Sequence, residues 1–275
     1  TGLTALALTG LHAAPRSPLN VRIGPHRRFA WVDGDLPAFK AIKDALGGTV
    51  NDVVLAVVAG ALRRWLEQRG DDPAGLELRA LVPVSVRAEA ERGALGNRVA
   101  AVYAPLPVGV ADPVARFRAV HEAMGRVKVS GHAIGAERLV ALAGFASPTV
   151  LSQAARLQSL QRFFNLTVTN VPGPQFPLFL LGRRLTDIYP LVPLAENTAL
   201  GIAVMSYDGA IDFGLVGDFD ALPDLDALAA ALGHAILELA EAAGVGDDAT
   251  RANGRGPAPR LRGGRRPFGR PRVGR

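Results

Sequence analysis

The chain has 275 residues, and 49% apolar with 20% charged residues is enough to bury a core, which excludes intrinsic disorder along the whole length. The absence of cysteine excludes disulfides, thiolate metal sites and cysteine nucleophiles. The net charge is +6, but nine of the 31 Lys and Arg residues lie in residues 251–275, which contain no acidic residue. The rest of the chain has 22 basic and 25 acidic side chains, so only the tail is basic.

Residues 1–33 contain several prolines and are predicted to be an extended connector with a short strand at residues 20–23. Thr49 is the expected N-cap of a helix that ends near Gly70, and Asp52 stands at its capping-box position. The first three turns of this helix are apolar nearly all round. This pattern predicts a helix buried within a domain, against a sheet.

Residues 78–86 and 98–106 are rich in Val, Leu and Ala and are predicted to be two strands joined by a loop. A helix is expected over residues 113–128, because Pro113 suits a first helical position. Two further helical segments are expected at residues 136–145 and 149–160.

The chain then returns to strand at residues 163–170, before a turn at residues 171–174. Residues 200–207 and 210–216 flank Asp208-Gly209, which is a signal for a two-residue type I′ hairpin. Strands that alternate with helices and end in a hairpin predict an α/β fold, a two-layer sandwich with a mixed β-sheet packed by helices.

The last predicted helix covers residues 223–243, with leucines at helical spacing. Its polar face is acidic, which is the wrong sign for anionic lipid. After Gly244 the composition changes to Gly, Pro and Arg, and residues 245–275 are predicted to be a disordered tail. No charge-free run is long enough to span a membrane without an interrupting proline.

The five histidines do not form a zinc-ligand pattern; they are His12, His26, His121, His132 and His234. His234 lies opposite the apolar stripe of its helix and is expected to form a solvated surface pair with Glu238. His121 is also expected at the surface. The chain contains no G-x-S-x-G, Walker A or G-x-G-x-x-G sequence, which disfavours serine hydrolase, P-loop and Rossmann functions.

Short blocks follow one another along the chain: SPLN (17–20), TVNDVVLA (49–56), VPVSVR (82–87), GNR (96–98), FNLTVTNVPGP (164–174), YP (189–190) and SYDG (206–209). In this order they resemble the bacterial wax ester synthase/acyl-CoA:diacylglycerol acyltransferase family, over about residues 15–243. The resemblance implies a coenzyme A-dependent acyltransferase fold, in which two similar α/β lobes meet at a tunnel for acyl-CoA and the acceptor alcohol.

The family's catalytic signature, adjacent histidines followed after three residues by Asp-Gly, does not occur in this chain. The resemblance therefore implies that this sequence is the C-terminal lobe and that the general-base His lies upstream of Thr1, which is not a Met. We expect residues 1–33 to connect from that N-terminal lobe, residues 34–244 to form the C-terminal lobe, and the isolated chain to be inactive.

Asn51 and Asp52 are candidates for the substrate tunnel, since the resemblance implies that this pair faces it and could orient the thioester or steady the oxyanion. The alternative role is helix capping. For Asn51 the two roles are equally supported, whereas for Asp52 the structural role is favoured. Asn97 is expected in a loop, while Arg98 is either a surface residue or a partner of a CoA phosphate.

Asn170, Pro172 and Gly173 belong to a strand-ending turn that the resemblance places beside the lobe interface, where a structural role is favoured over substrate contact. Asn20 has the same standing and is expected to hold the crossover between the lobes. The phenylalanines near this turn are expected in the core rather than along an acyl chain; they are Phe163, Phe164, Phe176 and Phe179.

The resemblance implies an O-acyltransferase that makes triacylglycerol or wax ester from acyl-CoA and diacylglycerol or a fatty alcohol, without metal or bound cofactor. It would be cytoplasmic, or peripheral to a membrane or lipid inclusions. One alternative is a catalytically inactive lipid-binding or scaffolding lobe, or a truncated paralogue. Nucleic-acid binding through residues 251–275 is a further alternative, which the acidic body disfavours.

Overall fold

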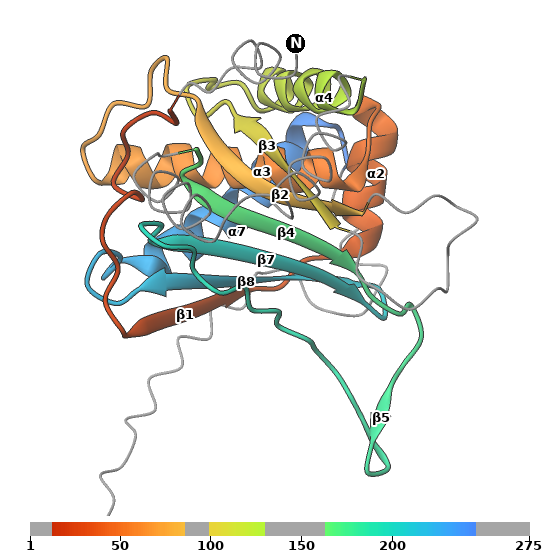
Figure 1. Ribbon diagram of the computed structural model, residues 1–275. Coiled ribbons are helices and arrows are strands. Elements are labelled where there is room, and N and C mark those ends of the chain that lie inside the picture. Colours follow the sequence, from red (N-terminus) through yellow and green to blue (C-terminus); the bar gives the residue numbers. More distant parts are fainter. Residues whose placement is uncertain (1–12, 86–98, 130–162, 246–275) are drawn as a thin grey trace, which may run out of the picture.

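The computed structural model describes residues 13–85, 99–129 and 163–245. The main strands are β1 (Arg27–Val32), β2 (Leu78–Ser85), β3 (Val99–Leu106), β4 (Leu166–Pro172), β7 (Leu200–Tyr207) and β8 (Ala210–Asp218). They form one sheet in the order β1-β8-β7-β4-β2-β3 (Figure 1). The pairs β2·β4 and β4·β7 are parallel and the others antiparallel, so the predicted mixed sheet is confirmed.

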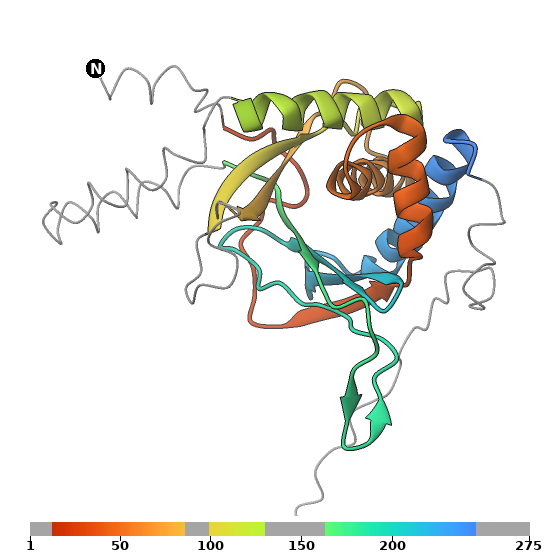
Figure 2. The same ribbon diagram turned by 90° about the vertical axis from the view of Figure 1, so that its right-hand side faces the viewer.

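The described helices are α2 (Leu36–Leu46), α3 (Val50–Gln68), α4 (Pro113–Val129) and α7 (Leu225–Ala242). They lie together on one face of the curved sheet, which confirms the predicted two-layer sandwich (Figure 2). The helices expected at residues 136–145 and 149–160 lie outside the described residues, as does the tail from residue 246.

Helix α3 forms the centre of the core. Its residues from Val53 to Leu62 are all buried, as the apolar sequence predicted. It packs against α7 and α4 and contacts β3, while alternate residues of the neighbouring strand β2, Leu78, Ala80 and Val82, join the same apolar cluster. Burial of a large apolar side chain contributes about 1.5–3 kcal/mol, so this helix is a main source of the fold's stability.

The hairpin signal is confirmed between β7 and β8. Asp208 and Gly209 have φ angles of 44° and 84°, as a type I′ turn requires. The amphipathic helix near the C-terminus is also confirmed, with Leu225, Leu228 and Leu232 buried.

Two expectations for the first half of the chain need correction, and one helix was not predicted. Residues 20–23 do not form a strand; the strand is β1, an edge strand that pairs with β8 within the segment expected to be a connector. The sequence analysis also missed α2, which Asp35 caps by accepting a hydrogen bond from the Ala38 amide. The prolines around residues 15–25 obscured the apolar–polar alternation that follows them, whereas Pro37 merely occupies the first turn of α2.

The segment 186–196 crosses the sheet face opposite the helices. Two glycines of the sheet make room for it, because a Cβ atom at Gly214 would lie 1.9 Å from the Pro190 carbonyl oxygen and one at Gly201 would lie 2.8 Å from the Val192 side chain. Tyr189 donates a hydrogen bond to Asp33 at 2.7 Å. Burial and this hydrogen bond raise the pKa of the Tyr189 hydroxyl.

Within the described ranges, no single helix is long and apolar enough to span a membrane. The pair α2 and α3 meets the length and composition criteria only together, with a bend of 98° between them.

Candidate functional site

The N-terminus of α3 carries two of the predicted site residues, and its capping box is confirmed. The Thr49 hydroxyl accepts a hydrogen bond from the Asp52 amide at 3.2 Å, and the Asp52 carboxylate accepts one from the Thr49 amide at 2.9 Å. Asp52 is only 2% exposed. Reciprocal bonds of this kind satisfy two amides that the first turn of a helix leaves without a partner.

A histidine also contacts the buried Asp52 carboxylate, and the sequence analysis missed it. Nδ1 of His121, on α4, lies 3.0 Å from Oδ2 of Asp52, while half of the His121 side chain is exposed. The expected surface position of His121 is therefore confirmed, but its contact with Asp52 was not predicted. The close approach depends on Gly48, where a Cβ atom would lie 3.0–3.2 Å from Phe117, Asp52 and His121.

Asn51 differs from its neighbour. Its side chain is half-buried, and its side-chain amide forms no hydrogen bond with any residue in the described part of the chain. Since the capping is done by Thr49 and Asp52, the Asn51 side chain is not needed for it, and it lies in the first turn, where a helix leaves backbone N–H groups without a partner of its own. Those groups and the helix dipole favour a negative charge at this position.

The end of β4 and the residue after it hold the second group of predicted residues. The strand continues to Pro172, so Asn170 and Pro172 belong to β4 rather than to the predicted turn, and only Gly173 follows it. Gly173 is required by packing, because a Cβ atom there would lie 2.3 Å from the Ser206 carbonyl oxygen. Its amide donates to the Ser206 hydroxyl at 3.3 Å, and Pro172 pairs with Ser206 at the end of β4. Asn170 is half-buried and pairs with Val204 in the sheet.

These two groups lie toward the same end of the sandwich. The strands β2, β4 and β7 are parallel and end at one edge of the sheet, and α3 begins beside α2 on the side toward which they point (Figure 1). In open α/β sheets this edge is the usual place for a ligand. Asn97 and Arg98 lie outside the described residues, immediately before β3.

Asn20 lies elsewhere, near the beginning of β4. Its amide donates to the Phe164 carbonyl at 3.0 Å, and its side-chain oxygen accepts from the Asn165 amide at 2.6 Å. Asn165 is fully buried and also binds the Pro15 carbonyl and the Arg79 amide. This network fastens the N-terminal segment to β2 and β4, which gives Asn20 a structural task within this chain.

The four phenylalanines near β4 do not form part of the core. Phe163 and Phe164 are half-buried and stack on Tyr103 of β3. Phe176 and Phe179 are 61% and 65% exposed, so the expectation of core positions is wrong for these two. They lie on a segment that leaves the body of the protein (Figure 1).

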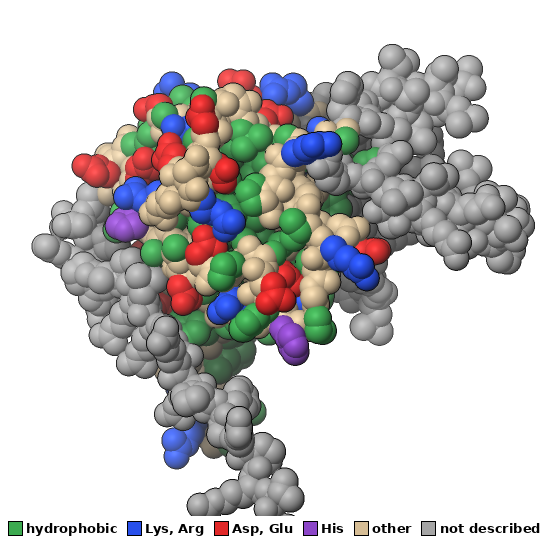
Figure 3. All heavy atoms as spheres, turned by 90° about the vertical axis from the view of Figure 1, so that its left-hand side faces the viewer, with side chains coloured by type: hydrophobic (Ala, Val, Ile, Leu, Met, Phe, Trp, Pro, Cys, Tyr) green, Lys and Arg blue, Asp and Glu red, His purple; other side chains and the backbone are tan. Residues whose placement is uncertain are grey.

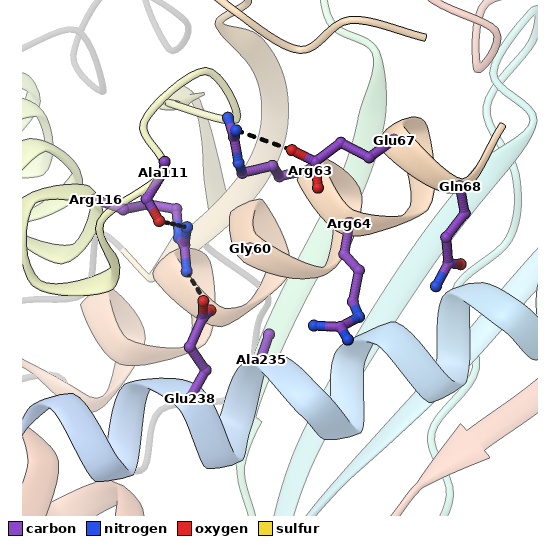
Figure 4. Close-up of a pocket in the computed structure, with 9 residues that line it drawn as sticks. All are labelled: Gly60, Arg63, Arg64, Glu67, Gln68, Ala111, Arg116, Ala235 and Glu238. Atoms are coloured by element: carbon purple, nitrogen blue, oxygen red, sulfur yellow. Dashed lines mark hydrogen bonds and ion pairs between the residues drawn. The ribbon is translucent and has the colours of Figure 1, made fainter. Parts of the chain in front are cut away.

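A cavity of about 430 Å³ opens between α3, α4 and α7. The Arg116 guanidinium lies in it over Gly60 and donates to Glu238 at 2.7 Å (Figure 4). Glu238 thus pairs with Arg116, which corrects the predicted pair with His234. Arg63 pairs with Glu67 at 2.8 Å.

The Arg116 contacts tie the three helices together, whereas the Arg63–Glu67 pair lies within α3. The residues that line the cavity include no histidine, serine, threonine or cysteine. Its two carboxylates, Glu67 and Glu238, which could act as a general base, are each paired with an arginine. Among the described residues, no group of three or more His, Asp or Glu could hold a metal ion.

Two protein-family models match the chain. The WS/DGAT C-terminal domain matches residues 95–240, and the wax ester synthase/diacylglycerol acyltransferase catalytic domain matches residues 2–54. A Mycobacterium tuberculosis protein named as a putative diacylglycerol O-acyltransferase is 38% identical over 242 residues, which are 86% of this chain and 48% of that protein. A Mycobacterium bovis protein of the same description is 38% identical over 240 residues, 86% of this chain and 53% of that protein.

Among solved structures, the chain is similar to the wax ester synthase/diacylglycerol acyltransferase from Marinobacter aquaeolei VT8, with a TM-score of 0.64 and 31% identity over 84% of this chain and 53% of that one. The PapA2 acyl transferase has the same fold, with a TM-score of 0.51 at 13% identity over 83% of this chain and 47% of that one. The chain thus spans about half the length of the relatives that it matches.

Proposed function

Because the chain belongs to the wax ester synthase/diacylglycerol acyltransferase family, we propose that it is the C-terminal half of an acyl-CoA-dependent O-acyltransferase. The substrates are acyl-CoA and either diacylglycerol or a long-chain alcohol, and the products are triacylglycerol or a wax ester. The observation that carries the proposal is the similarity of this half-length chain to the family's C-terminal domain. It is supported by the side-chain amide of Asn51, which has no hydrogen-bond partner among the described residues and lies at the end of the sheet toward which β2, β4 and β7 point.

In the proposed reaction, a histidine of the N-terminal half removes the proton of the acceptor hydroxyl. The hydroxyl oxygen attacks the thioester carbonyl carbon, the C–S bond breaks, and coenzyme A leaves with the proton on its sulfur. The residues of this chain bind and orient the thioester. The Asn51 amide and the N-terminus of α3 stabilise the negative charge that develops on the thioester oxygen.

The reaction as proposed forms no covalent acyl-enzyme and uses neither a metal nor a bound cofactor. Its partner is the N-terminal acyltransferase lobe. We place the enzyme in the cytoplasm, at the surface of a membrane or lipid inclusions, because its acceptor substrates partition into lipid. Nucleic acid is not a partner in this proposal.

The test compares two proteins in an esterification assay with palmitoyl-CoA and either diolein or hexadecanol. The chain of residues 1–275 is expected to show no turnover, whereas the chain extended by its upstream N-terminal half is expected to form ester. In the extended protein, Asn51→Ala should lower kcat/KM by about 100-fold, the typical loss of one oxyanion-stabilising group, without lowering Tm.

Thr49→Ser, which keeps the N-cap, is the matched control and should retain activity. An extended protein without adjacent histidines that esterifies neither acceptor would refute the proposal. Loss of activity in the Thr49→Ser control to the same degree as in Asn51→Ala would refute the specific role of Asn51.

A further inference from the structure

The cavity between α3, α4 and α7 lies apart from the candidate site at the start of α3 (Figure 4). Its volume of about 430 Å³ is in the range of small-molecule pockets. Gly60 in its wall is nine residues from Asn51 along α3, which is roughly 13 Å at the rise of an α-helix. A ligand in this cavity would therefore occupy a different place from the thioester.

The walls of the cavity are mostly polar. Nine residues line it, of which three are arginines and two are glutamates, and the apolar ones are only Gly60, Ala111 and Ala235. Pockets for apolar ligands are lined mainly by hydrophobic and aromatic side chains. The cavity therefore suits a small polar ligand rather than an acyl chain.

Arg64 gives the cavity a positive charge that no acidic residue offsets. Both glutamates of the cavity already pair with the other two arginines. Arg64 forms no hydrogen bond or ion pair with any residue in the described part of the chain, and its side chain extends from α3 toward α7 (Figure 4). The cavity thus attracts an anion, although residues 1–250 as a whole have more acidic than basic side chains.

Arg116 is held in the wall of the cavity by the protein itself. It is only 2% exposed, and its Nη1 donates to the carbonyls of Val110 and Ala111 at 3.0 and 3.1 Å. Gly60 provides the space for it, because a Cβ atom there would lie 2.7 Å from Nη2 of Arg116. The Nε atom of Arg116 has no hydrogen-bond partner among the described residues. A charge that is already fixed in position costs little entropy when an anion binds beside it.

The donors around the cavity favour a phosphate group. Arg64 and Gln68 lie one turn apart on α3, both point toward α7 (Figure 4), and the Gln68 amide has no partner in the described part of the chain. A phosphate group offers several acceptor oxygens, and the planar fork of an arginine binds two of them at once. Because the donors come from α3 and α4 in different directions, a tetrahedral group fits them better than a planar carboxylate.

We propose that this cavity binds a phosphate group through Arg64 and Gln68, with Arg116 supplying a further positive charge beside them. The group belongs either to a soluble phosphate compound or to a phospholipid head group, which present the same chemistry to the arginines. The proposal goes beyond the proposed function, because it assigns a ligand to a cavity that the acyl transfer does not use.

Isothermal titration calorimetry of the chain of residues 1–275 with inorganic phosphate and with glycerol 3-phosphate tests the site. Arg64→Gln should weaken binding by about tenfold or more, because it removes a charge-assisted contact. Its folding is not at risk, since the exposed Arg64 side chain has no partner among the described residues.

Arg118→Gln is the matched control, because Arg118 is an exposed residue of α4 that does not line the cavity. It removes the same charge and should bind phosphate as the unchanged chain does. Residues 251–275 add the same arginine background to every variant, so the difference between the two variants reports on the cavity. Absence of binding, or an equal loss in both variants, would overturn the proposal.

Glu67→Gln should have the opposite effect. Glu67 is a half-exposed partner of Arg63, and a pair of this kind contributes little to stability. Its replacement removes a carboxylate that competes with the ligand for the arginines, so phosphate should bind about three- to tenfold more tightly. Unchanged or weaker binding by this variant would contradict a phosphate site in the cavity.

Further probes identify the source of the phosphate. Flotation with phosphatidylcholine vesicles that contain phosphatidic acid should recover less of Arg64→Gln than of Arg118→Gln if the ligand is a head group. Equal recovery of the two variants, with the calorimetric difference retained, would support a soluble phosphate compound. Citrate that binds more tightly than phosphate would overturn the proposal in favour of carboxylates. None of these measurements involves ester formation, so failure of this site is distinguishable from failure of the proposed activity.

Discussion

Buried polar side chains connect segments of this protein that are far apart in the sequence. Asn165 joins the N-terminal segment to β2 and β4, and Asp52 joins the start of α3 to His121 of α4. In both cases a fully buried group has partners that satisfy it, as burial requires. The two residues therefore specify where neighbouring elements sit, in addition to any contribution to stability.

Asp218 shows how such a group couples stability to pH. Its carboxylate accepts hydrogen bonds from the amides of Gly24, Asp220 and Ala221 and lies 3.5 Å from Arg27. Burial alone would raise the pKa of Asp218, but the three amides and the arginine charge outweigh it and lower the pKa overall. The ionised form is thus favoured in the folded protein.

Asp218→Asn is expected to lower the free energy of unfolding at pH 7 by about 1–3 kcal/mol, because a neutral amide replaces a charged acceptor of several hydrogen bonds. A lowered native pKa gives stability that is present above the unfolded pKa of about 4 and is lost as the pH falls through the native value. Urea unfolding of both proteins should therefore show a difference that shrinks below about pH 4. A difference that stays constant from pH 7 to pH 3 would contradict this account, and the exposed Asp220→Asn is the control.

At the scale of elements, close approaches of backbone decide how the segments pack. Helix α3 follows from its own apolar sequence, but the segment 186–196 has no periodic pattern and is held by the shape of the sheet beneath it. Gly201 and Gly214 create that shape, since a side chain at either position would occupy the path of the segment. The Tyr189–Asp33 hydrogen bond then fixes it beside β1.

Gly214→Ala is expected to destabilise the protein by about 1–3 kcal/mol, because the added methyl group would meet a backbone carbonyl that cannot move without displacing the segment. Gly125→Ala on α4 is the matched control. No atom of the described residues beyond the helix's own backbone lies within 4 Å of the added Cβ there, and alanine in a helix should stabilise the protein by about 0.5–1 kcal/mol relative to glycine. Denaturant unfolding followed by circular dichroism measures the free energy of unfolding of both variants. A change of the same sign in the two variants would contradict the close packing of the segment 186–196 against Gly214.

At the scale of the whole molecule, charge and fold are separate properties. The described surface carries acidic and basic side chains interspersed on the face shown in Figure 3, whereas the excess of positive charge belongs to residues 251–275. Net charge is a statement about solubility and association rather than about the fold. The basic pI of about 10.4 therefore says little about what the sandwich binds.

Removal of residues 251–275 is expected to change the net charge at pH 7 from +6 to −3, since nine arginines and no acid are lost. The shortened chain should bind an anion-exchange instead of a cation-exchange column, and any retardation of RNA by the whole chain at low salt should disappear. A shortened chain that still retards RNA would show that the body itself binds nucleic acid.

The sequence by itself determined those features that depend on local periodicity and local turn chemistry. The buried α3 with its capping box, the amphipathic α7 and the Asp208-Gly209 hairpin all follow from residues close together in the chain. The ordered blocks also indicated the family, because their order does not depend on tertiary contacts.

Only the tertiary structure decided which distant residues meet and which apolar residues stay exposed. The contact of Asp52 with His121 spans 69 positions and that of Asn165 with the Pro15 carbonyl spans 150, and neither has a signal in spacing. Phe176 and Phe179 are apolar like core residues, but they are exposed because they lie on the segment by which the chain leaves the sheet after β4. The physical reason is that burial is a property of the packed fold, which a residue's own chemistry does not specify.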